Sequence, residues 1–368
     1  MSRSISRAIP EEDRPRCVAD CVDVLWKSEG GCRRTKGLEP VIDFLASNSM
    51  NIMLSDKEGC FVIMPDGTFS EKATTAVLKN FRAVSDRPAK GKDSTIKFLH
   101  QLNLTSVAAG AKKGKSLTLD VIFAAKTHKP GIPFRTIVSE RNSWLQAISG
   151  YLQRHLDSLH IVDPMCVPSS KAVVDFLNVS NPKGCSAFSI DVEELYYSMP
   201  HDDLKVSVKE CIIEHNDESA FGTRCGITVE DFLELLSVYL KFTLIGWQDK
   251  VYIQKSGVCI GSRVAPVLSN IFLGKIDRDL EPCLEKNTKK VLRYVDDYLV
   301  FVERADFHQK LDDVLKIFTE KGLGLRFTHE APKKNLIQLL DLRIEVIGQP
   351  PTASPFKSLA KAHSHARA

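Results

Sequence analysis

The spacing of apolar residues changes several times along the chain and predicts an alternation of strands and helices. Strand-like patterns occupy residues 61–64, 117–125, 134–139, 187–191, 291–302 and 325–327. Apolar residues three and four positions apart predict helices in residues 144–156, 169–177, 200–212, 265–272 and 307–321. Strands and helices in this mixed order predict an α+β fold.

The two ends of the chain lack such regular patterns. Residues 1–108 form an N-terminal region, in which the charged stretch Lys79–Lys92, with its proline and glycine, is expected to be a linker. Residues 349–368 contain three prolines and no acidic residue and are expected to be a flexible tail. Cys17, Cys21 and Cys32 have neither C-x-x-C spacing nor a nearby histidine, so we expect no zinc site there.

The composition is that of a folded protein, with 43% hydrophobic residues among 368. A net charge of only +4 does not by itself indicate a nucleic-acid partner, but Ala111–Arg141 carries seven basic and two acidic residues. This stretch is either a surface that faces phosphates or a solvated charged face. The N-terminus has no apolar signal core, and no run is long enough to span a membrane, so we expect an intracellular protein, in the nucleus or cytoplasm.

Three aspartates stand at the ends of predicted strands. Asp191 ends the half-buried strand 187–191, whereas Asp296 and Asp297 interrupt two strand-like runs in a hairpin pattern. If these strands are neighbours in one sheet, the three carboxylates can hold two Mg²⁺ ions for phosphoryl transfer, because Mg²⁺ prefers carboxylate oxygen. Alternatively, adjacent aspartates in a hairpin are ordinary turn residues.

The segment RYVDDYLVFV around Asp296 and Asp297 resembles the catalytic aspartate hairpin of reverse transcriptases, and SIDVEELYYSMPH resembles their first aspartate motif. The resemblance implies that Asp191, Asp296 and Asp297 are catalytic metal ligands. It also implies that Tyr196, five positions after the first aspartate, excludes the ribose 2′-hydroxyl. In isolation this tyrosine would be taken for a core residue. RNA-dependent RNA polymerases, which share the palm, usually have a polar residue there.

Two further segments resemble nucleotide-binding motifs of the same family. SGVCIGSRVAPVLSNIF, residues 256–272, resembles the motif that supports template and incoming nucleotide, which implies such roles for Gly261 and Ser262. Arg263 departs from the family pattern, which has proline there. AKTHKPGIPFRTIVS, residues 125–139, resembles the fingers hairpin, and its residues that would grip the triphosphate are Lys126, Lys129 and Arg135.

The wording KTHKP and the upstream segment SDKEGCFVIM are similar to Penelope-like retroelements, relatives of the telomerases. Near the C-terminal end, QLLDLRI in residues 338–344 resembles the primer-grip hairpin, and Lys333 or Lys334 is the candidate general acid for the departing pyrophosphate. The resemblance covers residues 55–347. The family normally continues into a thumb and often into a GIY-YIG endonuclease. Because this sequence stops about twenty residues after the primer-grip motif, we expect a truncated copy without them.

The resemblance thus implies a right-hand polymerase with fingers at 109–186 and a palm at 187–348, together a reverse transcriptase domain at about 109–348. Its antiparallel palm sheet would carry the aspartates and be flanked by helices. We expect an RNA-directed DNA polymerase that uses Mg²⁺, or Mn²⁺ as a substitute, with an RNA template, a DNA primer and dNTPs. A protein partner would supply the thumb or endonuclease. The alternative is an inactive or domesticated nucleic-acid-binding remnant of such an element.

Overall fold

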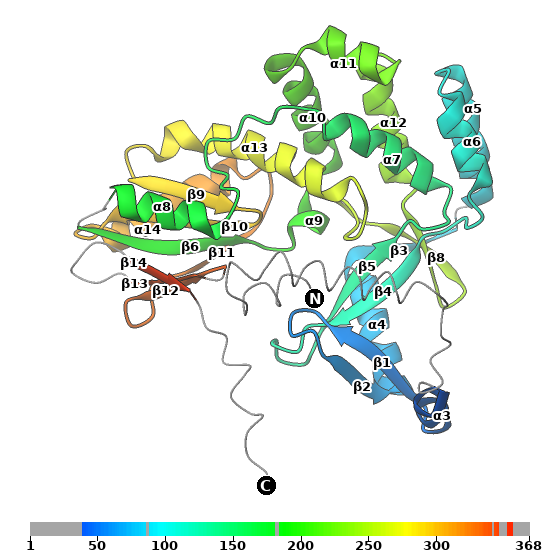
Figure 1. Cartoon of the computed structure of the whole chain (residues 1–368), viewed down its shortest axis with the longest axis horizontal. Helices are drawn as coiled ribbons and strands as arrows, with labels where there is room; N and C mark the ends of the chain where they lie inside the picture. The colour runs from blue at the N-terminus through cyan, green and yellow to red at the C-terminus, as the bar shows by residue number, and fades with distance from the viewer. Residues whose placement is uncertain (1–38, 86–87, 181–183, 341, 346–351, 356–368) are drawn as a thin grey trace, which may run out of the picture. The chain divides into compact units, whose positions relative to one another are not determined.

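The computed structural model describes residues 39–85, 88–180, 184–340 and 342–345, and the backbone of 352–355 (Figure 1). They belong to two compact units, Met1–Glu71 and Lys72–Ala368, which we describe separately. The N-terminal cysteines Cys17, Cys21 and Cys32 lie outside the described residues. In the described ranges no helix is both long enough and apolar enough to cross a bilayer.

The first unit contains a helix and a β-hairpin. Helix α3 spans Glu39–Ser47, and strand β1 (Met50–Ser55) pairs antiparallel with β2 (Phe61–Pro65). The strand predicted at 61–64 is therefore confirmed. Helix α4 (Asp66–Asn80) begins in this unit and ends in the second.

The first part of the second unit is mainly helical, with one β-hairpin. Its elements are β3 (Phe81–Val84), α5 (Pro88–Gln101), α6 (Thr105–Lys113), β4 (Asp120–Ala125), β5 (Phe134–Ser139), α7 (Leu145–Leu156) and α8 (Ser170–Ser180). Strands β4 and β5 pair antiparallel, which confirms the predicted basic hairpin. Strand β4 begins three residues later than predicted, because the backbone of Leu119 donates to the Leu244 carbonyl at 2.8 Å instead.

The linker predicted at Lys79–Lys92 is wrong. This stretch contains the end of α4, strand β3 and the start of α5. Pro88 opens the helix, where a missing N–H costs nothing. Gly91 is buried beneath Phe242, whose ring lies where a Cβ would be, so the glycine permits close packing rather than a loop.

The remaining elements form the larger part of the second unit. They are β6 (Cys185–Val192), α9 (Leu195–Ser198), α10 (His201–His215), α11 (Glu218–Cys225), α12 (Val229–Lys241), β7 (Leu244–Trp247), β8 (Lys250–Gln254), α13 (Ala265–Leu284), β9 (Lys290–Tyr294), β10 (Asp297–Glu303), α14 (Phe307–Lys321), β11 (Phe327–Glu330), β12 (Leu336–Leu339), β13 (Leu342–Glu345) and β14 (Thr352–Pro355). Strand β8 pairs with both β3 and β7. The helices predicted at 144–156, 169–177 and 307–321 are confirmed within two or three residues.

A four-stranded sheet, which we call the palm sheet, has the strand order β11-β6-β10-β9, with every pair antiparallel. Its faces alternate along β10. Tyr298 packs edge-on against Phe318 of α14, whereas Leu299 and Phe301 join the core with α8 and β12–β13. Figure 1 shows α13, in yellow, running along this sheet. An antiparallel sheet flanked by helices is the α+β arrangement that the sequence predicts.

The expected C-terminal tail is only partly described. Strand β14, which falls within 349–368, pairs antiparallel with β13, so these four residues belong to a three-stranded sheet. The other residues of the tail, and Asp341 of the QLLDLRI segment, lie outside the described residues.

Candidate active site

The palm sheet places two of the three aspartates directly opposite each other. Asp191 is the partner of Asp297 in the antiparallel register of β6 and β10. The backbone N–H of Val192 also donates to the Asp296 carbonyl at 3.1 Å, which fixes the position of the turn beside β6. The prediction that these strands are neighbours is confirmed, although Asp191 and Asp296 are 105 positions apart in the sequence.

The third aspartate belongs to a two-residue turn between β9 and β10. Tyr294 pairs with Asp297, so Val295 and Asp296 form the turn itself. Val295 has φ 55°, a left-handed conformation that is unfavourable for a β-branched residue. The turn therefore needs support from its surroundings.

Arg293 supplies this support from inside the protein. Its side chain is fully buried, and its Nη1 donates to the Val295 carbonyl at 2.8 Å. Its Nε donates to Asp277 of α13 at 2.6 Å, and its Nη2 pairs with Asp163. Tyr298 donates to the other oxygen of Asp277 at 2.7 Å. The residues flanking Asp296 and Asp297 are thus held to one buried network.

This network has the electrostatics of a buried ion pair. Burial raises the pKa of Asp277 well above its ordinary value, and the Arg293 guanidinium opposes that rise. The sequence analysis missed the network, because its members are far apart in the chain. The only local signal was an arginine inside the apolar run VLRYV.

The Asp191 carboxylate reaches solvent yet lies in a crowded, negatively charged neighbourhood. Partial burial, together with the nearby Asp296 carboxylate, raises the pKa of Asp191 above its ordinary value. A hydrogen bond with Asp297 and the charge of Lys129 oppose the rise. The tip of the β4–β5 hairpin therefore lies close enough to Asp191 for Lys129 to act on it.

The other two predicted triphosphate ligands lie on the same hairpin. The backbone N–H of Lys126 donates to the Pro133 carbonyl at 2.9 Å and closes the hairpin, while Arg135 faces Ala124 across it. Arg135 also acts electrostatically on Tyr197, the neighbour of Tyr196. Hairpin and palm thus face each other within the second unit.

Tyr196 lies in α9 and is half-buried, next to the loop that precedes α13. Its carbonyl accepts a hydrogen bond from the Val258 backbone at 2.6 Å. Gly257 has φ +75°, and a Cβ there would overlap the Tyr196 carbonyl. Only glycine permits this approach.

The same loop is pressed against the fingers hairpin at its other end. Gly261 has φ +95°, and a Cβ there would overlap the Val138 carbonyl. The Val138 backbone donates to the Ile260 carbonyl at 2.7 Å. The hydroxyl of Ser262 is buried and lies 2.6 Å from that of Tyr239, which donates to Glu140. The Ser262 hydroxyl is therefore held in this buried network, and its backbone N–H donates to the Cys259 carbonyl at 3.0 Å.

The structure does not link Lys333 and Lys334 to the aspartates through any hydrogen bond or ion pair of the described residues. Both are exposed, in the turn between β11 and β12. Lys333 instead lies 4.0 Å from Glu330, an exposed pair.

The chemistry of the three aspartates fits a divalent cation. Carboxylate oxygens are the ligands of hard ions, and the raised pKa of Asp191 reflects negative charge that a cation would relieve. Asp191, Asp296 and Asp297 could hold such ions. The carboxylate oxygens of these three aspartates do not all lie within 4.8 Å of one another. Among the described residues, one trio of possible metal ligands does meet this distance.

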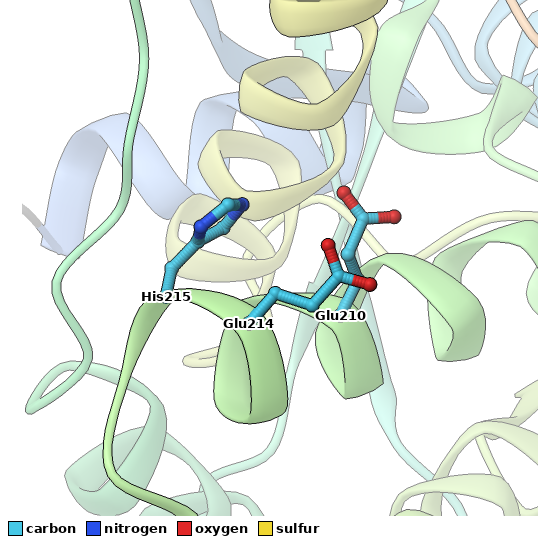
Figure 2. Close-up of side chains that lie close together, drawn as sticks. All are labelled: Glu210, Glu214 and His215. Carbon is cyan, nitrogen blue, oxygen red and sulfur yellow. The ribbon is translucent and has the colours of Figure 1, made fainter.

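That trio is Glu210, Glu214 and His215 of α10 (Figure 2). Glu210 is already neutralised, because Lys275 and Arg278 of α13 each donate to one of its oxygens at 2.6 Å. Burial alone would raise the pKa of Glu210, but the hydrogen bonds from Lys275 and Arg278 lower it below its ordinary value. We therefore assign no metal to this cluster.

Comparison with known proteins identifies the class of the chain. A family model described as reverse transcriptase (RNA-dependent DNA polymerase) matches residues 128–331, more than half of the chain. The chain belongs to the reverse transcriptase family. The match includes the three aspartates and the whole palm sheet. A search of curated proteins finds no match.

Solved structures of telomerase have a similar fold. One is apo telomerase from Candida tropicalis, truncated from its C-terminal domain, with a TM-score of 0.58, 14% identity and coverage of 82% of this chain and 63% of that chain. Another is telomerase from Candida albicans in complex with a TWJ fragment of telomeric RNA, with a TM-score of 0.58, 13% identity and coverage of 84% and 55%. The chain thus spans about three fifths of these telomerases. The likeness confirms the right-hand fold of palm and fingers.

Proposed function

We propose that the protein is an RNA-directed DNA polymerase that adds dNTPs to the 3′ end of a primer on an RNA template. The observation that carries this proposal is the register of the palm sheet, which sets Asp191 opposite Asp297 and beside Asp296. Membership of the reverse transcriptase family supports it.

In this proposal Asp191, Asp296 and Asp297 hold two Mg²⁺ ions, with Mn²⁺ as a substitute. Bound ions of this kind lower the pKa of the attacking 3′-hydroxyl and neutralise charge on the triphosphate. The buried Arg293 network keeps the turn in place while substrates change, so that the carboxylates need little reorganisation.

Basic residues of the β4–β5 hairpin would bind the triphosphate. Arg135 has the forked guanidinium that suits phosphate oxygens, and Lys126 and Lys129 add positive charge. The influence of Lys129 on Asp191 supports this role, because it places a hairpin cation near the carboxylates.

Sugar and base would be positioned from the other side of the site. We assign Tyr196 to exclusion of the 2′-hydroxyl, and Gly261 and Ser262 to the loop that supports the nucleotide and template. The tight contact of Gly257 with the Tyr196 carbonyl supports the first role, since it limits movement of α9. Lys333 or Lys334 remains our candidate general acid.

We further infer that the chain derives from a Penelope-like retroelement, on the wording KTHKP and SDKEGCFVIM. Within it, we assign residues 109–186 to the fingers and 187–348 to the palm. Its partners would be an RNA template, a DNA primer and dNTPs, and a protein partner would supply the thumb or endonuclease.

A primer-extension assay with Mg²⁺ tests the proposal. We expect incorporation by the wild type and by Asp312→Asn, an exposed control on α14, and loss of incorporation by Asp296→Asn and Asp191→Asn. The substitutions keep side-chain size and remove one charge. Equal incorporation by Asp296→Asn and the wild type would remove this carboxylate from catalysis. RNA binding without incorporation by any variant would favour the inactive remnant.

A further inference from the structure

A basin of about 1010 Å³ opens in the second unit, apart from the aspartates. It is lined by α6, α7, the end of α11 and Arg263, from the loop before α13; these helices are labelled in Figure 1. None of the residues that we assign to the polymerase reaction lines this surface.

The walls of the basin are fixed by packing. The Tyr151 hydroxyl of α7 donates to the Cys225 carbonyl at the end of α11, at 2.8 Å. On the other side α6 lies close on α7, since a Cβ on Gly110 would be only 2.8 Å from that of Ala147. These contacts hold α7 to α11 and to α6, the helices that line the basin.

The charge of the basin is strongly one-sided. Its basic residues come from every wall: Lys113, Lys115, Arg154, Arg224 and Arg263. No aspartate or glutamate lines it, and among the described residues none of these five side chains forms an ion pair. Five cations on one concave surface create a positive electrostatic potential there, and this potential attracts anions.

The positive charge of the basin affects the pKa of His155, a histidine that lines it. Burial lowers the pKa of His155, and Arg154 and Arg224 lower it further. The ring of His155 lies 4.6 Å from that of Tyr151 and is only half-buried. It therefore offers an aromatic surface among the residues that line the basin.

These features together favour a single-stranded nucleic acid over other anions. A free phosphate would engage only one part of a surface this large, whereas a chain of phosphates can reach cations on several walls. A stiff duplex cannot follow a concave basin, but a flexible single strand can. Cations with an interleaved aromatic ring are typical of single-strand binding.

The position of Arg263 indicates which strand this is. It directly follows Gly261 and Ser262, and its guanidinium lies over α7, 3.6 Å from where a Cβ on Gly150 would be. Arg263 thus connects the loop that we assign to the template with the basin. We propose that the basin binds the phosphates of the uncopied, single-stranded template, chiefly through Arg154 and Arg224. This inference rests on the proposed function.

Binding of primer–template to the full chain tests the inference. The duplexes are either blunt or carry a 5′ template overhang of about ten nucleotides, within the range of single-strand sites. We expect the wild type to bind the overhang duplex more tightly, and Arg154→Gln/Arg224→Gln to lose that advantage while binding the blunt duplex as before. Each phosphate contact contributes about 0.7 to the slope of log affinity against log salt concentration. The variant lacks two such contacts, so between about 50 and 200 mM salt its affinity for the overhang duplex should fall roughly 7-fold less than that of the wild type.

The control is Lys316→Gln/Lys321→Gln, which removes the same charge from exposed positions on α14. It should keep the overhang advantage. The inference is overturned if the two double variants behave alike, if the wild type ignores the overhang, or if Arg154→Gln/Arg224→Gln loses affinity for the blunt duplex equally.

The assay separates this inference from the polymerase proposal because binding needs no catalysis. If the wild type shows the overhang advantage but never extends a primer, the basin stands and the polymerase proposal fails. If the wild type extends primers and the overhang has no effect on binding, the polymerase proposal stands and the basin does not.

Discussion

Replacing Arg293 with methionine should weaken both the fold and the candidate site. Methionine fills part of the volume but removes every hydrogen bond of the guanidinium. Asp277, which is fully buried, would lose its cation, and the Val295 carbonyl would lose its donor. Removing one partner of a buried ion pair typically costs about 3–5 kcal/mol. We expect Arg293→Met to lower the free energy of unfolding by about this amount.

The expected effect on activity follows from the turn. Without the bond from Arg293, the left-handed Val295 has less support, and Asp296 can shift. A displacement of about 1 Å at a catalytic group can cost roughly 100-fold in rate. Arg293→Lys keeps the charge but not the fork, so it should fold better than Arg293→Met and still show a higher Mg²⁺ requirement and a lower kcat, with an unchanged KM for dNTP.

Urea unfolding followed by tryptophan fluorescence measures the first effect, since Trp144 is buried in the second unit. Arg343→Met, an exposed arginine on β13, is the control and should unfold as the wild type does. Arg293→Met/Asp277→Leu should regain part of the loss, because no unpaired Asp277 remains. If Arg293→Met and Arg343→Met unfold at the same urea concentration, the buried network does not anchor the hairpin.

Three further predictions concern other parts of the second unit. Tyr196→Ala should incorporate ribonucleotides more readily, and an active variant with unchanged preference in competition assays would reject the sugar role. Gly257→Ala should destabilise the fold by at least about 1–2 kcal/mol, since φ is +75° and the Tyr196 carbonyl leaves no space. Gly67→Ala, a control in the first turn of α4 with open space around it, should be neutral or slightly stabilising in thermal melts. Because the pKa of His155 is lowered in the folded protein, the unfolded chain binds a proton on this histidine at a higher pH than the folded protein does. The free energy of unfolding should therefore fall as pH drops through about 6.5. His155→Gln should show a smaller fall in urea titrations at several pH values, and an unchanged pH dependence would contradict the assignment.

The palm was predictable because its strands carry their own signals. Alternation around Asp191 and the two apolar runs beside Asp296 reveal both strands and the turn from local sequence alone. Their pairing is not a local property, and it was expected from the need to gather three carboxylates around cations. The register now places Asp297 opposite Asp191.

The features that escaped prediction depend on contacts between distant residues. Arg293 looks like an exposed strand residue until Asp163 and Asp277 are brought to it. Pro88 and Gly91 have the composition of a linker, but the ring of Phe242, far away in sequence, turns the glycine into a packing position. Local composition indicates which conformations a segment adopts easily, whereas tertiary contacts decide which conformation it has in the folded protein.

The central place of β6 in the palm sheet has a consequence for synthesis of the protein. Both of its neighbours, β10 and β11, come more than 100 residues later in the chain. During translation, the apolar strand β6 therefore has no partner at either edge, and each unpaired edge can pair with another molecule. Segments made earlier, or a chaperone, must shield it until residues 297–330 emerge.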